Sequence, residues 1–148
     1  MLATLQTLKQ LFYILQGSRL TAFDYCPDRL RLAIRTPLAN TVLKGSHQVH
    51  LVLDGCRNFH YESYTQVKTD RDRQYRLREL FTANLKLQGA VTQPPDILIM
   101  YTSVQADTCI EAGELHATVS DYKLYDEEFG GICLPDFFNL EAVRHRLF

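Results

Sequence analysis

The chain has 148 residues, enough for one domain with a substantial hydrophobic core. Its hydrophobic and charged fractions, 46% and 22%, are those of an ordinary globular protein rather than of a disordered or membrane-spanning one. The formal net charge of -1 gives no overall attraction to nucleic acid or to an anionic membrane, and no apolar run is long enough to span a bilayer. We therefore expect neither a nucleic-acid partner nor a membrane partner.

The N-terminal residues predict an amphipathic helix over 2–16, because leucines and Phe12 recur at spacings of three and four. Gly17 is a typical helix terminator. We expect the apolar stripe to cover a sheet face, and a dimerising helix is the alternative. Lys9 interrupts the apolar stretch, which argues against a secretory signal. The expected location is cytoplasmic, with the four cysteines reduced.

Two strands are predicted next, over 20–25 and 29–36, joined by a turn at Pro27. Alternation in the second strand directs Leu30, Leu32 and Ile34 inward and the arginines outward. Such an arginine row can bind phosphate or carboxylate groups, although it is more often a solvated surface. Arg31 and Arg35 are therefore candidate partner-binding residues.

Residues 47–64 carry the strongest local signal, a β-hairpin with arms over 47–53 and 56–64 around Asp54-Gly55. The apolar residues of both arms occupy odd positions, so a loop with an odd number of residues is required to place them on one face. The simplest such loop has three residues, Leu53 to Gly55. In this register His50 and His60 lie close together on the polar face of the hairpin.

Three hypotheses concern this hairpin. His50 and His60 are candidate metal ligands or a pH-sensitive pair, while two solvated imidazoles are the commoner outcome. Cys56 and His60 could form a nucleophile and base, as in a small enzyme. Exposed tyrosines are frequent in protein-recognition surfaces, which makes Tyr61 and Tyr64 candidate partner-binding residues.

The rest of the chain predicts further strands and a second helix. Residues 75–87 favour a strand, with helical spacing as the alternative, and the continuous apolar run in 97–104 predicts a central strand. Within 114–125 the inward positions change from odd to even, which predicts a β-bulge near Asp121 or a break at Ser120. Residues 136–147 predict a helix that begins after a proline.

These elements predict one α+β domain, with a mostly antiparallel, twisted sheet of six or seven strands flanked by an N-terminal and a C-terminal helix. This layout is similar, at the level of fold, to that of many small bacterial proteins, some of them toxin-immunity proteins. No P-loop, nucleophile elbow, HExxH or CxxC motif is present, so no cofactor is expected and an enzyme is disfavoured. The leading hypothesis is a non-enzymatic interaction module, of the immunity or inhibitor kind, that binds another protein or itself. The alternatives are a small-ligand or metal-binding protein and the Cys56–His60 enzyme.

Overall fold

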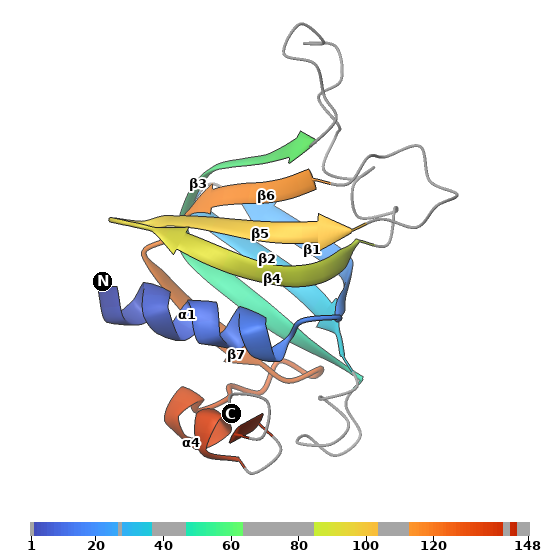
Figure 1. The fold of residues 1–148 in the computed structure, drawn as a ribbon. Coiled ribbons are helices and arrows are strands. Elements are labelled where there is room, and N and C mark those ends of the chain that lie inside the picture. The colour runs from blue at the N-terminus through green and yellow to red at the C-terminus, as the bar shows by residue number, and fades with distance from the viewer. Residues whose placement is uncertain are drawn as a thin grey trace, which may run out of the picture.

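The computed structural model describes residues 2–26, 28–36, 47–63, 85–103, 113–140 and 143–144. Within them, seven strands form one antiparallel sheet, accompanied by two helices (Figure 1). The strands are β1 (Arg19–Cys26), β2 (Asp28–Arg35), β3 (Gln48–Ser63), β4 (Lys86–Gln93), β5 (Ile97–Ser103), β6 (Gly113–Thr118) and β7 (Asp121–Tyr125). The helices are α1 (Leu2–Ile14) and α4 (Leu134–Asn139). The predicted α+β class and antiparallel sheet are confirmed.

The sheet closes on itself, which the sequence did not predict. The strand order is β2-β1-β4-β5-β6-β3-β7, and β2 also pairs with β3 along almost its whole length. The first six strands in this order therefore form a closed barrel, and β7 extends the β2–β3 side. Closure pairs β2, which would otherwise be an exposed edge strand, with β3.

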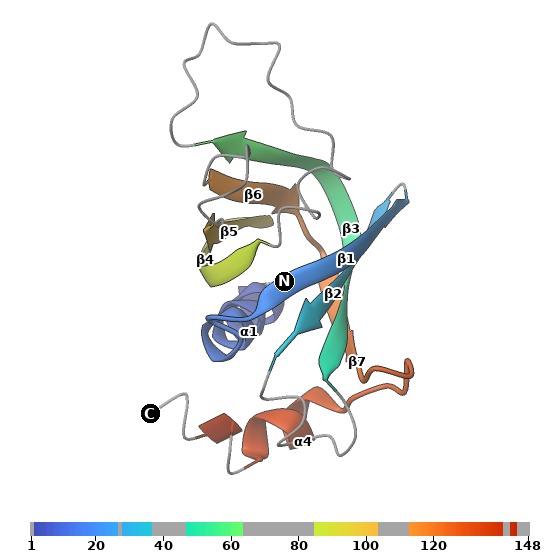
Figure 2. The same cartoon turned by 90° about the vertical axis from the view of Figure 1, so that its right-hand side faces the viewer.

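Helix α1 packs against the sheet of its own chain, beside β4 and β7 (Figures 1 and 2). The apolar side chains of the helix and of the first residue after it are fully buried: Leu8, Leu11, Phe12, Ile14 and Leu15. The helix ends at Ile14, and the turn that follows it ends at Gly17, which has a φ of +89° and donates its backbone N–H to the Leu87 carbonyl at 2.7 Å. The expectation that this helix covers the sheet is confirmed.

The predicted hairpin at Asp54-Gly55 is wrong, because β3 continues through these residues as one 16-residue strand. The strand is kinked between Gly55 and Asn58. Before this kink β3 pairs with β2 and β7, and beyond it β3 pairs with β6. Gly55 (φ +66°) and Asn58 (φ +54°) adopt left-handed conformations and mark two successive irregularities. The Asp-Gly pair therefore bends the strand, as Figure 2 shows, and does not reverse it.

The kink in β3 is matched by an interruption between β6 and β7. The Asp54 carbonyl accepts hydrogen bonds from the Ser120 backbone N–H (2.9 Å) and hydroxyl (3.1 Å), and the Thr118 hydroxyl accepts from the Arg57 N–H at 3.0 Å. Between Gly113 and Tyr125, the buried residues are odd-numbered up to Val119 and even-numbered from Tyr122. The predicted change of phase is confirmed, and it takes the form of one strand ending at Thr118 and the next beginning at Asp121.

The remaining elements follow the predictions in part. Strands β1, β2 and β5 lie within about one residue of their predicted bounds, and β5 lies between β4 and β6 as a central strand should. Most of the predicted 75–87 strand lies outside the described residues, and β4 begins near its end. A continuous helix over 136–147 is wrong, because α4 ends at Asn139 and Leu140 is extended (φ -62°, ψ 138°). None of the helices in the described ranges has the length and apolar character needed to cross a membrane.

We predict that Gly55→Ala destabilises the protein by at least about 1 kcal/mol more than Gly89→Ala. Both glycines have positive φ (+66° and +128°), so both substitutions strain the backbone. A Cβ at Gly55 would also collide with the Ser120 hydroxyl and lie 2.8 Å from its Cβ, whereas a Cβ at Gly89 meets nothing within 4 Å. Urea unfolding of both variants measures the difference, and equal losses would show that the kink is not tightly packed.

Candidate functional site

Two cross-strand pairs bring four potential ligands together on the outer face of β3 and β6. His60 lies opposite His116, and Glu62 lies opposite Glu114. Residues two apart on a strand share a face, and directly opposed residues are close neighbours. The kink therefore matters directly for this site, because it sets the face and register of β3 from Asn58 onward.

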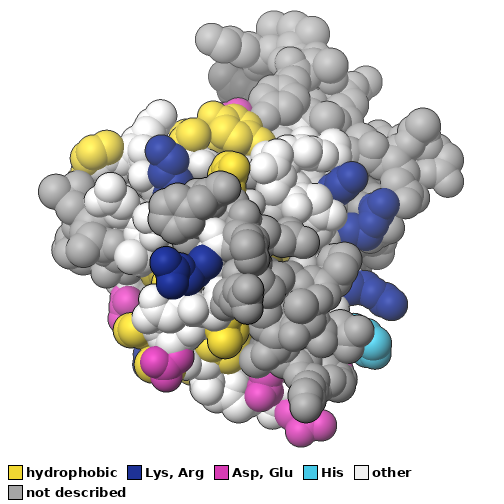
Figure 3. Space-filling model, turned by 60° about the horizontal axis from the view of Figure 1, so that its bottom comes forward, with side chains coloured by type: hydrophobic (Ala, Val, Ile, Leu, Met, Phe, Trp, Pro, Cys, Tyr) yellow, Lys and Arg dark blue, Asp and Glu magenta, His cyan; other side chains and the backbone are white. Residues whose placement is uncertain are grey.

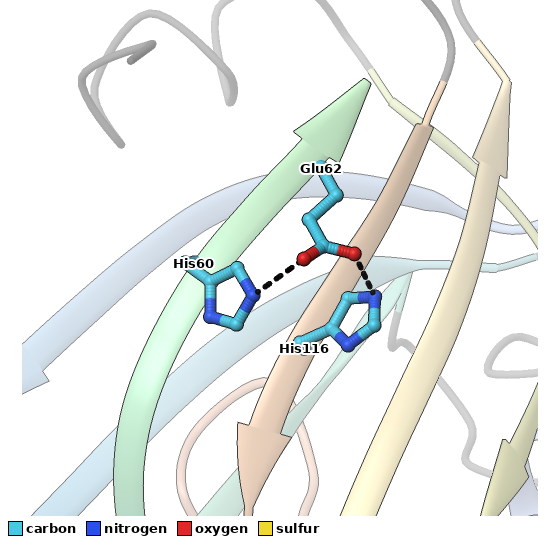
Figure 4. Close-up of side chains that lie close together, drawn as sticks. All are labelled: His60, Glu62 and His116. Atoms are coloured by element: carbon cyan, nitrogen blue, oxygen red, sulfur yellow. Dashed lines mark hydrogen bonds and ion pairs between the residues drawn. The ribbon is translucent and has the colours of Figure 1, made fainter. Parts of the chain in front are cut away.

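The Glu62 carboxylate lies between the two imidazoles (Figure 4). Its Oε1 is 3.3 Å from His60 Nε2, and its Oε2 is 3.1 Å from His116 Nε2. His116 Nε2 is also 2.9 Å from an oxygen of Glu114. The two rings are stacked with centroids 5.0 Å apart, and one ligand atom from each of His60, Glu62 and His116 lies within 4.8 Å of the others.

The contact of His60 Nδ1 determines which nitrogen of this ring carries the proton. Nδ1 lies 2.7 Å from the Asn58 carbonyl oxygen, which can only accept a hydrogen bond, so Nδ1 carries the proton. In the neutral ring Nε2 then presents a lone pair to the Glu62 carboxylate, which is also an acceptor. A cation between them, either a proton or a metal ion, turns this repulsion into attraction. Metal-binding histidines are commonly oriented by such a backbone carbonyl.

Solvent reaches this cluster from one side. The side chains of His116 and Glu114 are 17% and 21% exposed, whereas those of His60 and Glu62 are 50% and 58% exposed. Ion pairs this exposed add little to folding stability. The arrangement is therefore better suited to binding an ion from solution than to holding the barrel together.

His50 does not join His60, so the predicted proximity of these two residues is wrong. His50 lies on the same strand before the kink, is 5% exposed and stacks on Phe129 with ring centroids 4.0 Å apart. Its Nε2 is 3.3 Å from the Glu127 carbonyl oxygen, and its Nδ1 is buried without a hydrogen-bond partner among the described residues. The polar hairpin face does not exist because β3 never turns back.

Sequence reasoning missed His116, Glu62 and Glu114. A signal for them is present: His60-Tyr-Glu62 and Glu114-Leu-His116 are alternating segments, each with a histidine and a carboxylate on one face. Only the pairing of β3 with β6 brings the two segments together in opposite directions.

None of the other candidate residues that the structure describes is part of this cluster. The Cys56 side chain is fully buried in the core, whereas His60 is on the outer face, so the structure does not form the proposed nucleophile–base pair. Tyr61 packs partly buried against the core, and Tyr64 lies outside the described residues. Arg35 is exposed, and the Arg31 guanidinium lies 5.2 Å from the centroid of the Phe129 ring.

On the face drawn in Figure 3, the described residues include basic, acidic and apolar side chains. This agrees with the net charge of -1. No protein family, curated protein or solved structure matches the chain. Local geometry is therefore the basis for any functional proposal.

We predict that protein stability falls on acidification because of His50. Burial is the main cause that lowers the pKa of His50 below its ordinary 6.5, with the Arg31 charge acting in the same direction and Glu127 and Asp126 opposing it. The unfolded chain therefore binds the proton more readily, and stability is lost as pH falls below about 6.5. Denaturant unfolding at pH 7.5 and 5.5 should show a smaller loss for His50→Gln than for the wild type. A control variant, His47→Gln at an exposed position, should behave like the wild type. An unchanged loss in His50→Gln would contradict the prediction.

We predict that the Cys56 thiol does not react in the native protein at neutral pH. Burial raises its pKa to about 11, so the reactive thiolate is scarce. Iodoacetamide labelling followed by peptide mass analysis should modify the exposed Cys26 and Cys133 but modify Cys56 only after unfolding. Rapid native labelling of Cys56 would revive the enzyme hypothesis.

Proposed function

We propose that this protein binds a divalent transition-metal ion, Zn²⁺ in the first instance, through His60, Glu62 and His116. The observation that carries the proposal is the convergence of two imidazole nitrogens and a carboxylate oxygen within 4.8 Å. The proposal retains the metal-binding alternative raised by the sequence, but His116 and Glu62 replace His50 as partners of His60.

The donor set selects the class of metal. Ca²⁺ and Mg²⁺ are bound by oxygen ligands, whereas imidazole favours zinc, copper, nickel and iron. Two histidines and one carboxylate are a common ligand set for Zn²⁺ and leave a fourth position for water or another ligand. The same His116 Nε2 also lies 2.9 Å from a Glu114 oxygen, and this interaction would be lost when Nε2 binds the ion.

Metal binding is compatible with the leading hypothesis from the sequence, a non-enzymatic interaction module, which stays a prediction. A surface ion with an open position can recruit a ligand from a partner protein. The Cys56–His60 enzyme finds no support, because the two side chains lie on different faces of β3.

We predict that the wild type binds Zn²⁺ with 1:1 stoichiometry in isothermal titration calorimetry and that His116→Ala weakens binding by roughly 10–100-fold or more. Glu62→Gln should also weaken binding, because the amide replaces an anionic ligand by a neutral one. Binding should weaken between pH 7.5 and 5.5, since protons compete with the metal for imidazole.

The matched control is His47→Ala, which removes an exposed histidine outside the cluster and should leave the affinity unchanged. Circular dichroism establishes that each variant is folded. Equal Zn²⁺ affinity of the wild type, His116→Ala and Glu62→Gln would overturn the proposal.

A further inference from the structure

A second group of polar residues lies on the outer face of the barrel, before the kink of β3. Strand register places one row of side chains across four neighbouring strands: Asp24 (β1), Arg31 (β2), Val52 (β3) and Lys123 (β7). Arg31 and Lys123 flank Val52 on adjacent strands, so their backbones are about 10 Å apart. Two long cationic side chains at that spacing can reach one anion above Val52.

This row forms part of the floor of an open cleft of about 300 Å³. Tyr125 and Phe129 supply aromatic walls, and Arg29 and Asp54 lie at the next row of the floor. The volume is at the lower end of the range for small-molecule sites. The cleft is therefore suited to a small metabolite and not to a macromolecule.

The basic groups of the cleft differ in their pairing. Arg29 is held by Asp54, with Nε 3.0 Å from Oδ1. Neither Arg31 nor Lys123 forms an ion pair with any residue in the described ranges, although Asp24 lies opposite Arg31 on β1. Within the described part of the chain, the cleft thus offers two cations whose charges are not neutralised by direct contact with a carboxylate.

The aromatic wall is held in position before any ligand arrives. Phe129 has a φ of +65° at the tip of a turn in which an Asp126 oxygen accepts hydrogen bonds from the Glu128 N–H (3.0 Å) and the Gly130 N–H (2.7 Å). The ring stacks on the buried His50, yet the residue remains 48% exposed. Preorganisation of this kind lowers the entropic cost of binding a flat ligand.

We propose that this cleft binds a small organic anion in which a phosphate or carboxylate group is attached to a planar ring. Arg31 and Lys123 hold the oxyanion above Val52, and the ring contacts Phe129 and Tyr125. Arginine suits this role because its planar guanidinium can bind two oxygens at once. The site is separate from the metal cluster, which lies on the other side of the kink.

The test is isothermal titration calorimetry in the presence of EDTA, so that no metal ion contributes to anion binding. The probes are phenyl phosphate, benzoate and inorganic phosphate. We expect phenyl phosphate or benzoate to bind at least fivefold more tightly than inorganic phosphate, and the tighter of these two identifies the oxyanion. Arg31→Gln and Lys123→Gln should each weaken that binding at least fivefold, whereas Asp24→Asn should strengthen it.

Arg35→Gln is the matched control, because Arg35 is an exposed arginine of the same strand that does not line the cleft. Its affinity should equal that of the wild type. Absence of binding by both aromatic probes would overturn the proposal, as would an equal loss in Arg35→Gln and Arg31→Gln. Equal affinity for inorganic phosphate and phenyl phosphate would overturn the aromatic part of the site.

Discussion

The kink of β3 at Gly55–Asn58, bonded to the Thr118–Ser120 segment, is the constraint on which the rest of the structure depends. An unbent strand of this length could not pair with β2 and β7 before the kink and with β6 after it while keeping apolar residues inward on both sides. The hydrogen bonds from Ser120 to the Asp54 carbonyl satisfy backbone groups that the irregular ladder leaves unpaired. The kink thereby closes the barrel and fixes the faces of both proposed sites.

The sequence predicted the parts of the fold that depend on local patterns. Alternation in β2 identified Leu30, Leu32 and Ile34 as core residues, and all three are fully buried. Asp54-Gly55 was misinterpreted for a physical reason: a glycine at positive φ serves a hairpin turn and a β-bulge equally well. The partner decides between them, and here it is Ser120, 65 residues further along the chain.

The residues of the proposed metal site could not be predicted for the same reason, which is that local patterns do not identify partners far along the chain. Periodicity alone places His60 beside Glu62 on one face and His116 beside Glu114 on another, but it does not state which strands are neighbours. His50 was a reasonable partner for His60 only if the chain reversed between them. Because β3 continues, His50 is instead buried and stacked on Phe129, and the histidine that stacks on His60 is His116.

Within an overall net charge of -1, two surfaces of opposite character lie along β3 and its neighbouring strands, one on each side of the kink. Beyond the kink, lone pairs of His60, Glu62, His116 and Glu114 converge. Before it lie two cations, Arg31 and Lys123, which have no direct carboxylate partner among the residues that the structure describes. Folding stability alone would favour a different arrangement, in which the carboxylates of the first surface form ion pairs with the cations of the second. Two cations kept together lower stability slightly through repulsion and raise affinity for an anion. Imidazole nitrogens and carboxylate oxygens that converge in the same way raise affinity for a metal cation. The separation of these groups by the kink is therefore the strongest physical argument that both surfaces bind ligands.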